Sequence, residues 1–207
     1  MTIIHFVRHG ETVWHHDNRY AGVSDVALTP RGLDQAQALA EWAATQDISS
    51  IVSSDLSRAR ITAAPAAAAL GLAPVVDARL REVDFGGGEG LTAGELREQH
   101  PEAWRAFEAA PATSPLPGGE PGAAAVARAS TALAELSGTV LVVAHNTLGR
   151  LVLCHALGIA LDRYRDVFPA VLNGAVTTFE IPPGASDFAG RARLLRFNER
   201  TRAPVER

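Results

Sequence analysis

The sequence predicts an α/β fold, a three-layer sandwich in which a mostly parallel central sheet carries helices on both faces and a short helical lid. Short apolar runs of strand length alternate along the chain with helical segments long enough to connect parallel strands. The chain has 207 residues, of which 47% are hydrophobic and 20% charged, which suits one soluble domain. We therefore expect a single domain over residues 1–207, with the lid inserted at about 86–122.

The expected elements follow one another in a regular order. Strands are expected at 3–7, 48–53, 74–77, 140–144, 175–181 and 193–197. Helices are expected at 30–45, 55–70, 92–99, 101–109, 121–136 and 146–157. Thr29 and Pro30 are typical of an N-cap followed by the first helical residue, while Gly71 and Gly158 are typical of helix ends. The stretch 111–122 is rich in Pro and Gly and is interpreted as a loop, because no second core follows it.

The composition excludes several classes of function. All 19 basic residues are arginine, so chemistry that depends on a lysine, such as Schiff-base formation or the P-loop and kinase phosphate contacts, is excluded. The net charge of −4 argues against nucleic acid or an anionic membrane as a partner. Arginines near the C-terminus are interpreted as a solvated strand face and tail: Arg191, Arg193, Arg196, Arg200 and Arg202.

The single cysteine and the N-terminal sequence indicate a cytoplasmic protein. Cys154 has no partner for an intramolecular disulfide and is expected to be a small buried side chain. The N-terminus does not have the pattern of a signal peptide, and no apolar tract is long enough to span a bilayer. A homodimer formed through an edge strand is compatible with the sequence, which does not determine the oligomeric state.

Chemically active side chains follow four of the expected strands. Arg8 and His9 come directly after the first strand, Arg58 after the second, Glu82 after the third and His145 after the strand at 140–144. Because the carboxyl ends of parallel strands meet at one edge of a sheet, we expect these side chains to lie together.

This set of groups suits phosphoryl transfer. Two guanidinium groups can bind phosphate oxygens through forked hydrogen bonds, and the helix after His145 would add N–H groups and a positive dipole end. A neutral imidazole can then attack phosphorus, while a carboxyl group protonates the leaving oxygen and afterwards activates water.

Five blocks along the chain carry a resemblance to a known family. They are Arg8-His9-Gly10-Glu11-Thr12, Ser53-Ser54-Asp55-Leu56-Ser57-Arg58-Ala59, Leu80-Arg81-Glu82 with Phe85-Gly86, Glu89-Gly90-Leu91-Thr92, and His145. In this order, over about residues 3–181, they resemble the histidine phosphatase superfamily, the phosphoglycerate mutase-like fold. The resemblance implies that His9 is the phosphorylated nucleophile and Glu82 the general acid/base. It also implies that Arg8, Arg58 and His145 bind phosphate, that His145 stabilises the transition state, and that neither a cofactor nor a metal takes part.

Four positions depart from the pattern of the family. His15 stands in place of the usual asparagine and can still donate one hydrogen bond to phosphate, with a strength that depends on pH. Ala21 lacks the polar side chain that often precedes Gly22, and Gly88 replaces an aromatic residue. Asn146 replaces a glycine and is a suitable helix N-cap. The expected substrate-binding residues are Arg8, His15, Gly22, Arg58, His145 and Asn146.

Within the family, the sequence favours a phosphatase over a phosphoglycerate mutase-type phosphotransferase. The mutases carry a longer insertion with paired basic residues, whereas the only arginines between Glu82 and His145 are Arg97, Arg105 and Arg128, none of them adjacent to another. A short lid lets water reach the phosphohistidine. The substrate is then a small phosphorylated metabolite, and the lid is expected to contact its non-phosphate part.

The sequence also admits two other interpretations, a metal site and a non-catalytic binding protein. A metal site at His9, Glu11, His15 and His16 is disfavoured, because neighbouring residues of an extended chain point to opposite sides and no further ligand pair accompanies them. A non-catalytic protein that binds a phosphorylated metabolite is the alternative from another class, and it would have no need of the general acid Glu82. The lid aromatics Trp104 and Phe107 are expected to pack between helices.

Overall fold

The central sheet has six strands and is mostly parallel, as predicted. The computed structural model describes residues 1–182 and 188–201, and the strands lie in the order β3-β2-β4-β1-β5-β6. Strands β1 to β4 are parallel, while β5 and β6 are antiparallel to their neighbours. Their bounds are Thr2–Arg8 (β1), Ser50–Ser53 (β2), Val75–Val76 (β3), Gly138–Ala144 (β4), Val176–Ile181 (β5) and Arg193–Glu199 (β6).

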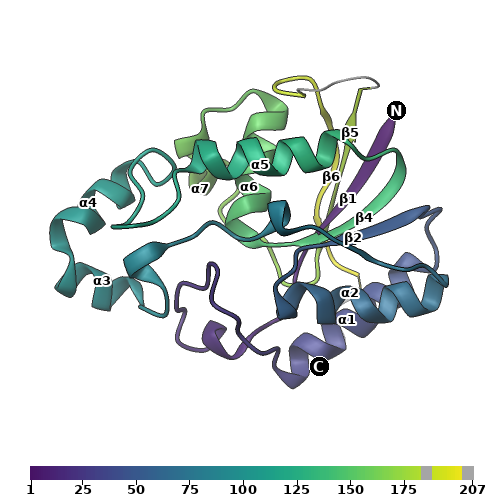
Figure 1. Ribbon diagram of the computed structural model, residues 1–207, viewed down its shortest axis with the longest axis horizontal. Helices are drawn as coiled ribbons and strands as arrows, with labels where there is room; N and C mark the ends of the chain where they lie inside the picture. The colour runs from purple at the N-terminus through teal and green to yellow at the C-terminus, as the bar shows by residue number, and fades with distance from the viewer. Residues whose placement is uncertain (183–187, 202–207) are drawn as a thin grey trace.

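Helices cover both faces of this sheet, which confirms the three-layer sandwich (Figure 1). Helices α1 and α2 cover one face, and α5 and α6 cover the other, while α3 and α4 extend to one side. The bounds are Pro30–Ala43 (α1), Ser57–Leu70 (α2), Ala93–Gln99 (α3), Pro101–Ala109 (α4), Gly122–Ala134 (α5), Asn146–Leu157 (α6) and Tyr164–Val167 (α7). Short 3₁₀ turns lie at Val13–His15, Ala78–Leu80, Gly86–Gly88 and Leu161–Arg163.

Strand β4 lies inside the sheet and is buried on both faces, which explains its continuous apolar sequence. Val140 and Val142 pack into the core beneath α5 and α6, whereas Leu141 and Val143 pack into the core beneath α1 and α2. All four are fully buried.

The predicted bounds hold for α4 and α6 and differ by a few residues elsewhere. The strand expected at 48–53 begins at Ser50, and the helix expected at 121–136 runs over Gly122–Ala134. The sequence did not predict the 3₁₀ turn at Leu161–Arg163 or α7, because segments of one turn are too short for a helical period to appear.

The register of β1 against β4 places the two catalytic candidates side by side. Arg8 pairs with Ala144 in the parallel ladder, so His9 and His145 leave adjacent strands at the same edge. The loop after β1 then passes very close to the start of α1. A Cβ at Gly10 would lie 2.5 Å from the carbonyl oxygen of Gly32, so this approach requires glycine.

Helix α4, which lies in the segment expected to form the lid, packs on the rest of the fold through an aromatic cluster. Trp104 and Phe107 of α4 are 4% and 2% exposed and contact Tyr20 with their rings, and Phe85 contacts Tyr20 and Phe107. The predicted packing role of these two lid aromatics is therefore confirmed. No helix in the described part of the chain is long and apolar enough to cross a membrane.

Candidate active site

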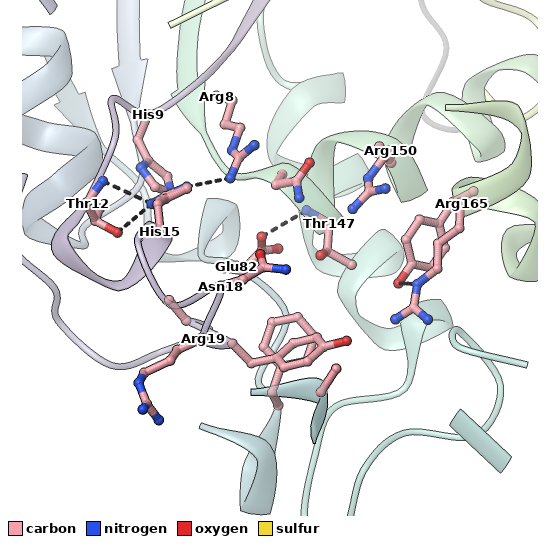
Figure 2. Close-up of a pocket in the computed structure, with 16 residues that line it drawn as sticks. Arg8, His9, Thr12, His15, Asn18, Arg19, Glu82, Thr147, Arg150 and Arg165 are labelled. Atoms are coloured by element: carbon pink, nitrogen blue, oxygen red, sulfur yellow. Dashed lines mark hydrogen bonds between the residues drawn. The ribbon is translucent and has the colours of Figure 1, made fainter. Parts of the chain in front are cut away.

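A cavity of about 220 Å³ lies at the edge of the sheet where β1 and β4 end (Figure 2). Five of the predicted site residues line it: Arg8, His9, His15, Glu82 and Asn146. The other lining residues are Thr12, Asn18, Arg19, Tyr20, Ala21, Phe85, Ala93, Thr147, Arg150, Tyr164 and Arg165. The convergence expected from the strand ends is thus present for these five residues, whereas Arg58 and His145 are not among the residues that line the cavity.

The His9 imidazole is held in one tautomer. Its Nδ1 lies 2.7 Å from the carbonyl oxygen of Gly10, which can only accept, so Nδ1 carries the proton and Nε2 has a free lone pair. Burial and the neighbouring guanidinium groups of Arg58 and Arg8 lower the pKa of His9 well below 6.5. The ring is therefore neutral near pH 7, with its nucleophilic nitrogen at Nε2.

Arg8 is fixed beside this ring by two contacts. Its Nη1 donates to the carbonyl oxygen of Val171 at 2.6 Å, and its Nη2 lies 2.6 Å from Nε2 of His15. Burial lowers the pKa of Arg8 to about 10, which leaves it charged at neutral pH. A guanidinium group can only donate, so Nε2 of His15 accepts from Arg8. Nδ1 of His15 lies 3.0 Å from the backbone nitrogen of Thr12 and 2.8 Å from the Thr12 hydroxyl.

The expectation that His15 would contact phosphate in a pH-dependent way is corrected by this geometry. Burial and the charge of Arg8 lower the pKa of His15 to about 4, so the ring stays neutral through the physiological range. Both ring nitrogens are engaged by protein groups, Nδ1 by Thr12 and Nε2 by Arg8. His15 therefore lines the cavity but positions Arg8, a role that its place in the sequence did not reveal.

Arg58, the second phosphate-binding candidate, is fully buried behind the cavity wall. It donates to the carbonyl oxygens of Ala21, Gly22 and Ser24, while its Nε has no protein partner. The backbone N–H groups of the same loop bind the carboxylate of Glu89. The loop is thus held between one guanidinium group and one carboxylate.

Gly22 has a structural role that the sequence analysis did not assign to it. It was expected to bind substrate, but it is not among the residues that line the cavity. Its carbonyl accepts from Arg58 at 2.6 Å, and a Cβ here would lie 2.1 Å from a Glu89 oxygen. The absence of a side chain lets the loop approach Glu89.

The Glu82 carboxylate sits against the start of α6 and is 4% exposed. Its Oε1 accepts from the backbone N–H groups of Val83 and Leu148, and its Oε2 accepts from the N–H of Thr147 at 2.8 Å (Figure 2). Oε2 has one of these bonds and Oε1 has two, so Oε2 is the oxygen with room for a proton. The backbone N–H groups at the start of α6 were expected to bind phosphate. This is wrong for Thr147 and Leu148, because their N–H groups donate to the Glu82 carboxylate.

His145 lies next to His9 and has free ring nitrogens. The two ring centres are 5.3 Å apart, His145 is 1% exposed, and neither of its nitrogens has a protein partner. Burial and the charge of Arg58 lower the pKa of His145 well below 6.5. A buried imidazole without partners is costly unless a ligand completes its hydrogen bonds.

Asn146 was expected to cap α6, but it is the first residue of the helix and His145 occupies the N-cap position. The Asn146 side chain lines the cavity, with its Oδ1 buried and unpartnered. The expected substrate contact at this position is therefore compatible with the geometry, whereas the capping role is not.

Arg128 of α5 is a functional candidate that the sequence analysis missed. Its guanidinium group donates five hydrogen bonds. Three go to the carbonyl oxygens of Arg79, Arg81 and Glu82, and two go to the carboxylate oxygens of Glu120. Every donor of this guanidinium group is used, and three of them hold the segment that carries Glu82. Only the pairing of distant segments could have shown this, since no local motif surrounds Arg128.

We expect Arg128→Gln to impair the positioning of Glu82. A displacement of about 1 Å can reduce turnover about 100-fold, so the loss should reach this order on an alkyl phosphate and be smaller on p-nitrophenyl phosphate, whose leaving group needs little protonation. The control is Arg79→Gln, which removes side-chain ion pairs to Asp77 and Glu135 instead. Equal losses on both substrates would show that Arg128 acts on the fold and not through Glu82.

The buried histidines should make the stability of the protein sensitive to acid. The unfolded chain binds protons near pH 6.5 that folded His9 and His145 exclude, so the free energy of unfolding should fall as the pH drops below 6.5. Each histidine contributes up to about 1.4 kcal/mol per pH unit in this window. Urea unfolding at several pH values should give a shallower decline for His145→Gln. His16→Gln is the control, because the His16 side chain is 92% exposed, and identical slopes for all three proteins would contradict the expectation.

The residues considered for a metal site lie in different places. His9 and His15 line the cavity, while His16 forms a hydrogen bond with Asp17 on the surface. Cys154 is buried, as expected, and burial raises the pKa of its thiol to about 11. The lid was expected to contact the non-phosphate part of the substrate, but within 86–122 only Ala93 lines the cavity. Among the C-terminal arginines, Arg202 lies outside the described residues.

Comparison with known proteins identifies the family of this chain. The sequence profile of the histidine phosphatase superfamily (branch 1) matches residues 4–192. Phosphoserine phosphatase 1 of Hydrogenobacter thermophilus is 33% identical over 163 residues, which cover 76% of this chain and 77% of that protein. The probable phosphoglycerate mutase GpmB of Klebsiella pneumoniae is 44% identical over 105 residues, which cover 51% of this chain and 48% of that protein. The chain thus spans about half the length of this relative.

A solved structure agrees over almost the whole fold. The native structure of a mycobacterial glucosyl-3-phosphoglycerate phosphatase superposes with a TM-score of 0.84 at 30% identity, covering 95% of this chain and 98% of that chain. The family expected from the sequence is confirmed, and the phosphatases among these relatives agree with a phosphoric monoester hydrolase. The cavity at the ends of β1 and β4 and the match over residues 4–192 lead to the same conclusion: this chain belongs to the histidine phosphatase superfamily.

Proposed function

We propose that this protein hydrolyses a small phosphomonoester through a phosphohistidine intermediate on His9, with Glu82 as general acid/base and without a metal ion. The observation that carries the proposal is the His9 tautomer, because the Gly10 carbonyl holds the proton on Nδ1 and leaves the Nε2 lone pair free. The cavity of about 220 Å³ supports a small substrate, since pockets for drug-sized ligands measure about 300–1,000 Å³.

In the first step, the Nε2 lone pair of His9 forms a bond to phosphorus and the bond from phosphorus to the ester oxygen breaks. The departing oxygen keeps the electron pair and takes a proton from Oε2 of Glu82. Arg8, Arg58 and His145 stabilise the charge on the three non-bridging oxygens during this transfer. Each of these three side chains has N–H groups or ring nitrogens without a protein partner.

In the second step, water attacks the phosphorus of the phosphohistidine. Glu82, now a carboxylate, accepts a proton from this water as its oxygen bonds to phosphorus. The bond between phosphorus and Nε2 breaks, and the electron pair returns to the ring. Inorganic phosphate leaves, and His9 and Glu82 recover their initial protonation states.

Hydrolysis is proposed over phosphoryl transfer to a second site on the substrate. The lid contributes only Ala93 to the cavity wall, which supports access of water to the phosphohistidine. The similarity to a probable phosphoglycerate mutase makes transfer between the 2- and 3-positions of phosphoglycerate the second candidate.

The two candidates give different products from the same reagents. The protein is incubated with p-nitrophenyl phosphate or 3-phosphoglycerate in the presence of EDTA, and free phosphate and 2-phosphoglycerate are measured. We expect stoichiometric release of phosphate from at least p-nitrophenyl phosphate, unaffected by EDTA. Accumulation of 2-phosphoglycerate without phosphate release would favour the mutase, and binding of phosphomonoesters without turnover would favour a non-catalytic protein.

A further inference from the structure

Two arginines on the cavity wall have no part in the mechanism proposed above. Arg150 projects from α6 and Arg165 from α7, and both line the cavity. In Figure 2, His9 and Arg8 lie at one end of the cavity, Arg150 and Arg165 lie at the other, and Glu82 lies between the two ends. Glu82 is placed to protonate the leaving oxygen, so the two arginines are on the side of the leaving group.

One aromatic ring holds the two guanidinium groups together. The Cζ of Arg150 lies 4.9 Å and that of Arg165 lies 5.4 Å from the ring centre of Tyr164, which is 1% exposed. The Cζ of Arg165 also lies 4.6 Å from the ring centre of Phe107. Contacts with aromatic faces restrain a guanidinium group while leaving its N–H bonds available.

Most donors of these two arginines have no acceptor in the described part of the chain. For Arg150, the structure gives one bond, from Nη1 to the carbonyl oxygen of Phe168 at 3.3 Å, and its buried Nε is unpartnered. For Arg165, it gives the bond from Nε to the Tyr164 hydroxyl at 3.0 Å and a hydrogen bond to the Tyr20 side chain. Arg128, in contrast, uses all five of its N–H bonds on protein acceptors.

The end of the cavity formed by Arg150 and Arg165 also carries positive charge that, among the described residues, no ion pair with a carboxylate balances. Within residues 1–182 and 188–201, no ion pair joins Arg150 or Arg165 to an acidic side chain, and Glu82 is the one carboxylate that lines the cavity. Arg19 lines it too but is paired with Glu95 at 2.9 Å. Partly buried guanidinium groups without a counter-ion are costly, and an anionic ligand would remove this cost.

We propose that Arg150 and Arg165 bind a second oxyanion, a carboxylate or a phosphate, on the leaving group of the substrate. The inference rests on the proposed function, because the phosphoryl group that reacts occupies the opposite end of the cavity. Planar guanidinium forks match the geometry of both oxyanions. The substrate class is therefore an acidic phosphomonoester, and esters of neutral alcohols should be poor substrates.

The test compares substrates that differ in this second group. 3-Phosphoglycerate and glycerol 3-phosphate share a three-carbon chain. The first carries a carboxylate where the second carries a hydroxymethyl group. Propane-1,3-diol bisphosphate and 3-hydroxypropyl phosphate form the corresponding pair for a phosphate. A charged hydrogen bond contributes about 10- to 100-fold in affinity, so we expect the anionic member of at least one pair to have a kcat/KM higher by this factor. The pair that responds identifies the oxyanion.

Variants connect this preference to the two arginines. Arg165→Gln and Arg150→Gln should each reduce the preference for the anionic substrate about tenfold or more. Arg163→Gln is the control, because Arg163 is an exposed neighbour paired with Asp166, and it should keep the full preference. Hydrolysis with no preference in either pair, or a preference that survives both substitutions, would overturn the inference alone. Failure to hydrolyse any phosphomonoester, including p-nitrophenyl phosphate, would overturn the proposed function instead.

Discussion

His9→Asn should reduce the hydrolysis of p-nitrophenyl phosphate by about four or more orders of magnitude, as is typical when a catalytic nucleophile is removed. Asparagine presents no lone pair at the position of Nε2, so no bond to phosphorus can form. The measurement is kcat under saturating substrate, with a correction for spontaneous hydrolysis.

The control for His9→Asn is the binding of inorganic phosphate, measured by calorimetry. Arg8, Arg58 and His145 remain in the variant, and their unpartnered nitrogens should still bind the anion. A variant that binds phosphate and keeps more than about one per cent of the wild-type kcat would show that another group attacks phosphorus.

Glu82→Gln should slow alkyl phosphates about 100- to 10,000-fold and p-nitrophenyl phosphate far less. An alkoxide is a poor leaving group and needs the proton from Oε2, whereas nitrophenolate leaves with little assistance. The measurement is the slope of log kcat/KM against the pKa of the leaving alcohol, which should be much steeper in the variant. A parallel loss on all leaving groups would contradict the role of Glu82 as the acid.

The stability of Glu82→Gln must be followed as well, because the carboxylate also satisfies backbone groups. It accepts from the N–H of Val83, Thr147 and Leu148, and a glutamine would turn its NH₂ group toward at least one of these donors. A buried N–H left without an acceptor costs about 1–3 kcal/mol. Assays are therefore made well below the melting temperature of the variant. Glu102→Gln is the control, because Glu102 is exposed.

The sequence was sufficient to predict the layers of the fold and the residues that meet at the sheet edge. Alternating strand and helix periods fix which segments are parallel, and the ends of parallel strands share an edge, so His9 and His145 could be paired in advance. The same pattern predicts which faces are buried, as the continuous apolar sequence of β4 shows.

Contacts between distant backbone segments could not be predicted in this way. The bonds of Arg128 to the Glu82 segment and of Glu89 to the loop at 22–24 join residues far apart in the chain, and no local motif encodes them. The position of Glu82 at the start of α6 likewise depends on packing and changes which N–H groups remain free. The arginines at the far end of the cavity come from α6 and α7, and α7 is too short to leave a periodic signal.

The chemical identity of the trapped intermediate tests the mechanism most directly. The protein is mixed with ³²P-labelled substrate, quenched with alkali within the first turnover, and digested to separate the two isomers of phosphohistidine. We expect the label on Nε2 of His9, because Nδ1 carries a proton that it donates to the Gly10 carbonyl and has no free lone pair. Label at Nδ1, label on another residue, or product formation with no labelled protein at any time would contradict the mechanism.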